Sequence, residues 1–243
     1  MKTPVAPKNQ LSVLIVGDDP LVAEFSEIAA AAKYAVVPPG SIKNLRPVSG
    51  KISIALELSN IDLAQKRKNL EMLDRSLPET TAILSSSVNV SVLDQARWII
   101  RNHRLVGIAA LPTLVKNTLV EVSPSAFTSE ASVDVARRFF ASVNKEIAVV
   151  QDRVGMVLPR ILCQIINEAM FAVQQDVALP EAVDTAMKLG MNYPSGPIEW
   201  GEKIGFTQVC AALDALHADL GEERYRVCPL LKEIAATGKF WGK

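Results

Sequence analysis

The segment SVLIVGDDPLVAEFSEIAAAAK, residues 12–33, decides the fold because it has the pattern of a strand, a tight turn and a helix. Residues 12–17 form a short apolar run that ends in glycine, which is typical of a buried parallel strand. Asp18 or Asp19 is the expected N-cap, and Pro20 fits the first turn of an alanine-rich helix. A strand, turn and helix of this kind predict a doubly wound α/β sheet.

The same alternation continues to about residue 150 and then stops. Further strands are expected at 34–37, 51–57, 81–87, 104–110, 118–122 and 146–150, and helices at 61–76, 92–102 and 128–143. Beyond this point the pattern is helical, beginning with a long apolar helix at 155–175. We therefore predict a Rossmann-like, doubly wound sheet domain over residues 1–150 and an all-α domain over residues 151–243.

The composition argues against several classes of partner. The 26 basic and 26 acidic side chains cancel, so no net field attracts nucleic acid or an anionic membrane. Cys163, Cys210 and Cys228 are widely spaced, which predicts neither a disulfide framework nor a metal site. Residues 1–10 lack the pattern of a signal peptide, and the charge run at 66–68 is expected on a solvated helix face. We expect a cytoplasmic protein with no metal, no nucleic-acid partner and no membrane partner.

The turn after the first predicted strand departs from the dinucleotide-binding motif G-x-G-x-x-G. Gly17 supplies the first glycine, but Asp19 and Val22 stand where the second and third belong. A carboxylate 4 Å from a phosphate charge is repelled by about 4 kcal/mol at an effective dielectric constant near 20. Pro20 also removes one N–H from the helix start, and residues 37–40 lack the acidic residue that binds the ribose. These departures predict that the chain has no cofactor.

The runs PRILCQIINEAM, AVDTAMKLGMNYPSGPIEWGEKIG and YRVCPLLKEIAATGKFWGK, within residues 159–243, resemble the C-terminal domain of 3-hydroxyacyl-CoA dehydrogenases. The segments before residue 150 follow the order of that family's NAD-binding domain. The resemblance implies a homodimer through the helical domain and an acyl-CoA ligand. Five residues of this domain are typical of turns: Asn192, Tyr193, Pro194, Gly196 and Pro197. Two interpretations of them remain open: these residues either shape the substrate cleft or fix the turns between helices.

The resemblance also locates the catalytic positions. The family's histidine lies in a stretch like G-M-H-F-F-N-P, and its glutamate lies in L-V-E-V. Residue 109 of this chain takes the histidine's place and is alanine, whereas Glu121 retains the glutamate. The family's histidine takes the proton from the 3-hydroxyl, and a positioned base of this kind contributes roughly 10²–10⁴ in rate. Glu121 is then either a surviving catalytic residue or a carboxylate kept for local hydrogen bonds, and neither His103 nor His217 fits the empty position.

Few of the positions at which the family binds its substrate through polar side chains keep a suitable polar residue in this chain. In the run after the fourth predicted strand, the family's asparagine falls at Ser87 and its substrate-binding serine at Asn89. The asparagine of the family's N-R-I-L stretch falls at Pro159. Residues 39–51 are too few for the helical excursion that grips CoA in the family, and the chain stops at 240–243 within a stretch that continues in relatives. Asn89 is therefore the best remaining candidate for binding substrate, although it also suits a turn.

Three hypotheses follow. We favour a family homologue that has lost catalysis, a pseudoenzyme that acts as a dimeric scaffold or as an acyl-thioester-binding protein. The alternative is an active NAD-dependent 3-hydroxyacyl-CoA dehydrogenase with an altered cofactor or base, for which Glu121 is the available candidate. The third is a non-catalytic subunit of a fatty-acid or aromatic-acid degradation complex, bound to a β-oxidation enzyme.

Overall fold

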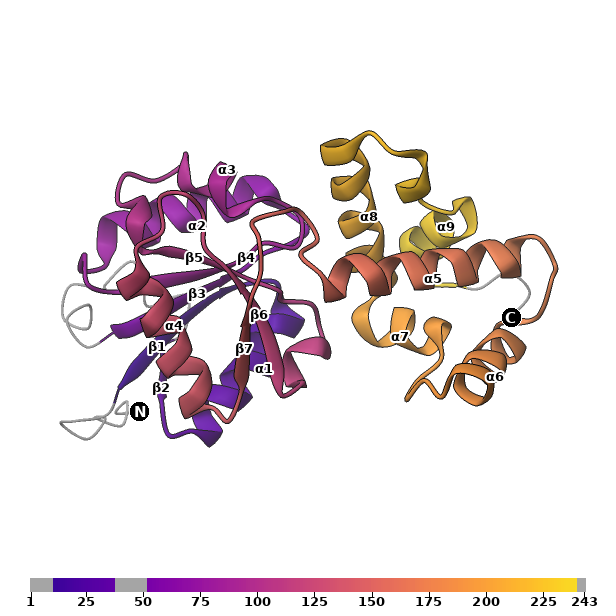
Figure 1. The fold of residues 1–243 in the computed structure, drawn as a ribbon, viewed down its shortest axis with the longest axis horizontal. Coiled ribbons are helices and arrows are strands. Elements are labelled where there is room, and N and C mark those ends of the chain that lie inside the picture. Colours follow the sequence, from indigo (N-terminus) through magenta and orange to yellow (C-terminus); the bar gives the residue numbers. More distant parts are fainter. Residues whose placement is uncertain (1–10, 38–51, 240–243) are drawn as a thin grey trace.

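The computed structural model describes residues 11–37 and 52–239. Within them, seven strands form one sheet in the order β2-β1-β3-β4-β5-β6-β7 (Figure 1). The strands are β1 (Ser12–Gly17), β2 (Ala35–Val37), β3 (Ile52–Leu58), β4 (Ala82–Ser86), β5 (Leu105–Ile108), β6 (Leu119–Ser123) and β7 (Glu146–Val149). Neighbouring strands are parallel except β5 and β6, so the predicted Rossmann-like sheet is confirmed.

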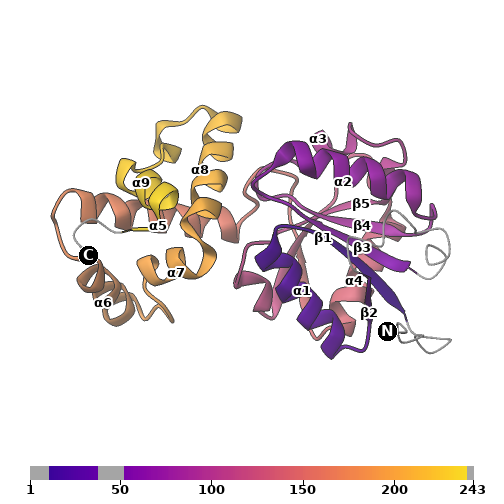
Figure 2. The same cartoon turned by 180° about the vertical axis from the view of Figure 1, so that it is seen from behind.

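Helices cover both faces of this sheet, as a doubly wound fold requires. They are α1 (Asp19–Ala31), α2 (Leu63–Ser76), α3 (Val92–Ala96) and α4 (Glu130–Ser142). Alternate residues of β1 point to opposite faces: Val13 and Ile15 pack with the cluster that includes α1 and α4, whereas Leu14 and Val16 pack with α2 and α3. Figures 1 and 2 show α2 and α3 on one side of the strands and α1 and α4 on the other.

The order of the strands places a ligand-binding edge. The chain passes from β1 to β2 on one side and then crosses to β3 on the other side of β1. The carboxyl ends of β1 and β3 therefore flank the point where the strand order reverses, which is where open α/β sheets bind ligands. Three sequence expectations fall wholly or mostly outside the described residues. They are the missing ribose contact at 37–40, of which only Val37 is described, the short segment 39–51 and the chain end at 240–243.

After β7 the chain forms helices: α5 (Leu158–Gln174), α6 (Pro180–Met191), α7 (Pro197–Ile204), α8 (Phe206–Leu220) and α9 (Pro229–Thr237). These helices, called the helical part below, enclose an apolar core in which Ile166 and Leu213 are fully buried, and Val88 and Leu111, which precede β7, belong to the same cluster. The residues up to β7 are called the sheet part. Short 3-10 turns lie at Asn102–Arg104, Leu114–Lys116 and Glu223–Tyr225. The division into domains at residue 150 stays a prediction.

Two helix boundaries differ from the sequence expectation. The helix predicted at 92–102 ends at Ala96, because the Asp74 carboxylate accepts hydrogen bonds from the backbone N–H groups of Ile100 and Arg101 and turns the chain there. The helix predicted from residue 155 begins at Leu158. Gly155 and Met156 have φ values of +79° and +47°, which belong to left-handed backbone and cannot continue an α-helix.

The charge run at 66–68 was expected on a solvated face, and this expectation is wrong for its first residue. Lys66 is fully buried and pairs with the buried Glu57 of β3, whereas Arg67 and Lys68 are exposed. A lysine enters a protein interior only with a partner of opposite charge. In the part of the chain that the structure describes, no helix is long and apolar enough to cross a bilayer.

Candidate functional site

Polar residues from the ends of four strands meet around Asn60, which follows β3. Its backbone N–H donates to the Asp18 carboxylate at 2.9 Å, and its side-chain amide donates to the Ala110 carbonyl at 2.8 Å. Its carbonyl oxygen accepts from the Asn89 amide at 2.8 Å, and its side-chain oxygen accepts from the Ser86 hydroxyl at 2.6 Å. Asn60 therefore ties the ends of β1, β3, β4 and β5 together at the ligand-binding edge.

Gln208 brings the helical part into the same network. It lies near the start of α8 and is only 7% exposed. Its amide nitrogen donates to Asp18 Oδ2 at 2.9 Å, and its amide oxygen accepts from Asn60 Nδ2 at 3.1 Å. Figures 1 and 2 show α8 on the side of the helical part that faces the sheet, with α6 on the far side.

The turn that presents Asn60 is supported from beneath by the buried ion pair of Glu57 and Lys66. The Lys66 ammonium also donates to the Ser59 carbonyl at 3.1 Å, next to Asn60 in the chain. Burial lowers the pKa of Lys66 below its ordinary value, and the nearby carboxylates of Glu57 and Asp18 offset part of that shift. The side chain of Lys66 therefore supports the turn from inside the sheet part, within electrostatic range of Asp18.

Gly17 is required where it stands. Its φ is +139°, and a Cβ built there would lie 2.5 Å from the Leu58 carbonyl carbon. Only glycine therefore lets β1 pass this close to β3 at the start of the turn.

The rest of this turn is acidic. Asp18 occupies the N-cap position of α1, but its side chain does not cap the helix and joins the Asn60 network instead. Asp19 is exposed at the first position of the helix, Pro20 follows it, and Val22 is half-buried. The turn therefore places two carboxylates where the G-x-G-x-x-G motif has open backbone N–H groups.

The two predicted catalytic positions, residues 109 and 121, lie side by side in the sheet part. The Ala109 N–H donates to the Glu121 carbonyl at 3.1 Å, so residues 109 and 121 are neighbours where β5 and β6 adjoin. The two oxygens of the Glu121 carboxylate accept from the backbone N–H groups of Val157 at 2.7 Å and Leu158 at 2.6 Å. Glu121 is only 8% exposed and binds the start of α5, so it joins the sheet part to the helical part.

The two candidates for substrate binding differ in what they offer a ligand. Ser87 is fully buried, and its hydroxyl oxygen accepts from the Gln95 amide at 3.0 Å. The Ser87 hydroxyl also donates to the Ser85 carbonyl at 3.4 Å, so it already has partners within the sheet part. Asn89 is 8% exposed, and its side-chain oxygen is buried without a hydrogen-bond partner among the described residues. Asn89 therefore retains a spare acceptor at the ligand-binding edge.

The histidines lie elsewhere. His103 is in the 3-10 turn that precedes β5, at the opposite end of that strand from residue 109, and its side chain is 44% exposed. His217 is near the end of α8 and pairs loosely with Glu223. In the described ranges, no cluster of three or more His, Cys, Asp or Glu side chains is arranged to hold a metal ion.

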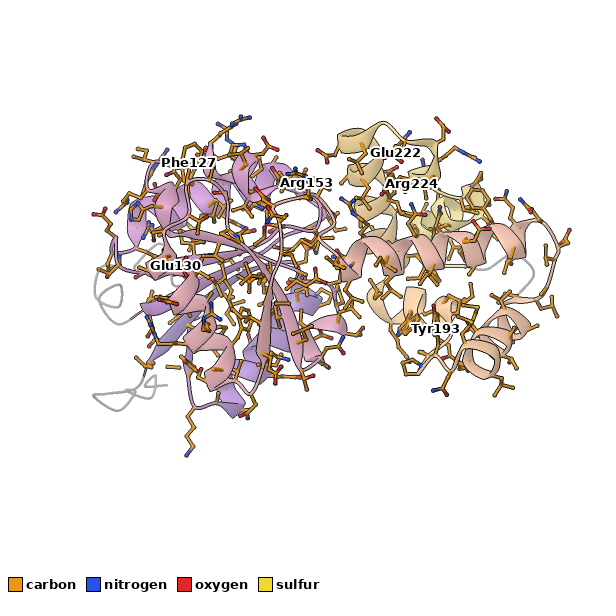
Figure 3. The ribbon with its side chains drawn as sticks, in the orientation of Figure 1. Phe127, Glu130, Arg153, Tyr193, Glu222 and Arg224 are labelled. Atoms are coloured by element: carbon orange, nitrogen blue, oxygen red, sulfur yellow. The ribbon has the colours of Figure 1, made fainter. Side chains whose placement is uncertain are left out.

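The turn residues of the helical part fix the path from α6 to α7. Asn192 ends α6 with a left-handed φ of +56°. A Cβ on Gly196 would lie 2.1 Å from the Asp184 carboxylate, which caps the start of α7. The Tyr193 ring, seen in the α6–α7 turn in Figure 3, packs against Trp200 with centroids 5.4 Å apart. The geometry of these residues supports their role in the turns.

Sequence comparison gives the relatives of this fold and site. Residues 155–243 match the family model for the 3-hydroxyacyl-CoA dehydrogenase C-terminal domain, and residues 42–153 match the model for its NAD binding domain. A 3-hydroxybutyryl-CoA dehydrogenase of Clostridioides difficile is 30% identical over 192 residues, which cover 79% of this chain and 68% of the relative. A probable 3-hydroxybutyryl-CoA dehydrogenase of Bacillus subtilis strain 168 is 33% identical over 185 residues, which cover 76% of this chain and 64% of the relative.

Solved structures agree on the fold. The crystal structure of M. tuberculosis FadB2 has a TM-score of 0.81 at 20% identity, over 95% of both chains. The (S)-3-hydroxybutyryl-CoA dehydrogenase PaaH1 of Ralstonia eutropha has a TM-score of 0.74 at 22% identity, again over 95% of both chains. The chain belongs to the 3-hydroxyacyl-CoA dehydrogenase family.

Family membership corrects the expectation that the chain has no cofactor. That expectation is wrong, because residues 42–153 belong to a domain family described as NAD binding, so NAD is the implied cofactor. The match begins beyond the turn at 17–22, where Asp19 and Pro20 do not form the glycine-rich pyrophosphate cradle.

Proposed function

We propose that this chain is a family member that has lost the proton-transfer step and acts as an acyl-thioester-binding protein. The observation that carries the proposal is that Ala109 lies beside Glu121, whose carboxylate binds the start of α5. Oxidation of a 3-hydroxyl removes a hydride from C3 and leaves the hydroxyl proton to a base. Alanine cannot accept that proton.

Glu121 does not replace the missing base in this arrangement. Each of its oxygens accepts a short hydrogen bond from a backbone N–H group at the helix start. Both carboxylate oxygens are therefore already engaged with the backbone at the start of α5. Moving it toward a substrate would also leave two backbone N–H groups of α5 without a partner.

Asn89 supports the ligand-binding half of the proposal. Its buried side-chain oxygen has no partner among the described residues, at the edge where α/β sheets bind ligands. A hydroxyl group on a ligand would satisfy that oxygen by donating to it. The relatives named above are 3-hydroxybutyryl-CoA dehydrogenases, and we propose the same ligand class for this chain.

Calorimetric titration with 3-hydroxybutyryl-CoA and with butyryl-CoA tests this function. The two ligands differ only in the hydroxyl group, so we expect the first to bind about threefold to tenfold more tightly, the contribution of one hydrogen bond. In Asn89→Leu that preference should disappear. Equal affinities in the wild-type protein, or no binding above that of free CoA, would refute the proposal.

We further propose a homodimer through the helical part. Asp184 is the buried residue of α6, while Leu179, Leu189 and Met191 are 74%, 83% and 61% exposed. Leu179 also lines a cavity of about 1260 Å³ between α6, α7, α9 and the end of α5. A second copy of this surface would cover the apolar side chains that one protomer leaves in water.

An active dehydrogenase is the second candidate. Two observations favour it: the relatives are dehydrogenases, and Glu121 is retained next to residue 109. It requires Glu121 to leave the start of α5 when substrate binds. The two candidates differ in turnover, because only an active dehydrogenase oxidises NADH with a 3-ketoacyl-CoA.

A further inference from the structure

The carboxylate of Asp18 is held by donors from both parts of the molecule. Its Oδ2 accepts from the backbone N–H groups of Asn60 at 2.9 Å and Ile61 at 3.4 Å, both in the sheet part. It also accepts from Gln208 Nε2 of the helical part at 2.9 Å. Because hydrogen bonds to an ionised group are stronger than neutral ones, this carboxylate is the strongest acceptor in the network.

Gln208 makes a second bond that depends on the same closed arrangement. Its side-chain oxygen accepts from Asn60 Nδ2, so both ends of one amide are used by the sheet part. Separating α8 from the sheet breaks both bonds at once.

The other described contacts between the parts include an apolar cluster and three backbone bonds. Val88 and Leu111 are buried in the same apolar cluster as side chains of α5 and α8. The Glu121 carboxylate accepts two bonds from the start of α5, and the Gly155 N–H donates to the Val88 carbonyl.

We propose that Gln208 is a latch that holds the helical part closed over the switch point between β1 and β3. A ligand that enters at this edge must compete with Gln208 for Asp18 and Asn60. The latch therefore reduces the apparent affinity for such a ligand, since only the open fraction of the protein binds it. The inference rests on the proposed function only for the identity of that ligand.

Hydrogen exchange in the ligand-free protein tests the latch by itself. We expect Gln208→Leu to raise the exchange rate of the backbone N–H groups of residues 60 and 61 by about tenfold or more, the effect of losing a hydrogen bond to a charged group. Gln208→Glu, which keeps the shape but places a carboxylate against Asp18, should do the same. Gln164→Leu is the matched control, because the Gln164 amide donates to the Arg224 carbonyl within the helical part.

Two outcomes decide the inference. Faster exchange at 60 and 61 in both Gln208 variants, with an unfolding midpoint close to that of the Gln164→Leu control, supports the latch. Unchanged exchange in a folded Gln208 variant overturns it, whatever the protein binds.

Titration of Gln208→Leu with 3-hydroxybutyryl-CoA then separates the latch from the function. If this variant binds the ligand more tightly than the wild-type protein, by the same factor as the rise in its exchange rate, both the latch and the proposed function are supported. Faster exchange without any binding of this ligand retains the latch and counts against the proposed function. Binding that weakens while exchange rises shows that Gln208 contacts the ligand, which overturns its assignment as a competitor.

Discussion

The Glu121 carboxylate binds the first backbone N–H groups of α5 and so contributes to stability whatever its part in catalysis. We expect Glu121→Gln to lower the free energy of unfolding by about 1–2 kcal/mol, because it removes a charge from the helix N-terminus and weakens one hydrogen bond. Chemical denaturation measures this change.

Glu27→Gln is the matched control, since Glu27 is exposed in the middle of α1. Its unfolding free energy should stay within about 0.5 kcal/mol of the wild-type value. Equal stability of Glu121→Gln and Glu27→Gln would show that Glu121 is free in solution and available for catalysis.

Sequence patterns identified residues 109 and 121 but not the residues around them. The sequence does not mark Asn60 as a site residue, because a lone asparagine after a strand is common in turns. Its importance comes from Gln208, which is far away in the sequence and meets it only when α8 packs against the sheet. Asp18 was expected near the N-cap of α1 and stands there, but its carboxylate binds residues that follow β3.

At the scale of elements, β3 and α2 are joined by the buried pair of Glu57 and Lys66. Glu57→Gln leaves the lysine charge buried without its counter-ion, which typically costs about 3–5 kcal/mol of unfolding free energy. The double variant Glu57→Leu/Lys66→Met removes both charges and should recover most of that loss. Denaturation of the wild-type protein and these two variants compares them, and a double variant less stable than Glu57→Gln would contradict a coupled pair.

Most elements could be predicted from apolar patterning, because strands such as β1 and β3 are continuous buried runs. The helix boundaries that differ from the prediction are set by side chains and backbone angles that apolar patterning does not report. Asp74 ends the helix before residue 100, and Gly155 delays the start of α5. The burial of Lys66 could not be predicted for a similar reason, because its partner Glu57 lies on a different element, β3.

At the scale of the whole molecule, the exposed apolar surface of α6 predicts self-association. We expect Leu189→Asp to shift the protein from dimer to monomer in sedimentation velocity, because it places a charge where the second copy would pack. Ile100→Asp is the control, since Ile100 is 88% exposed but lies in the sheet part. A wild-type protein that sediments as a monomer at all concentrations would contradict the proposed dimer.

The function is also tested on the whole molecule, because turnover requires the sheet part, the helical part and the ligand together. The most direct measurement is the initial rate of NADH oxidation with acetoacetyl-CoA over a wide range of protein concentration, beside an active dehydrogenase of the family. We predict no rate above background at any concentration, since residue 109 is alanine and Glu121 binds the start of α5. A rate that rises in proportion to the protein and disappears in Glu121→Gln would contradict the loss of catalysis and establish Glu121 as the base.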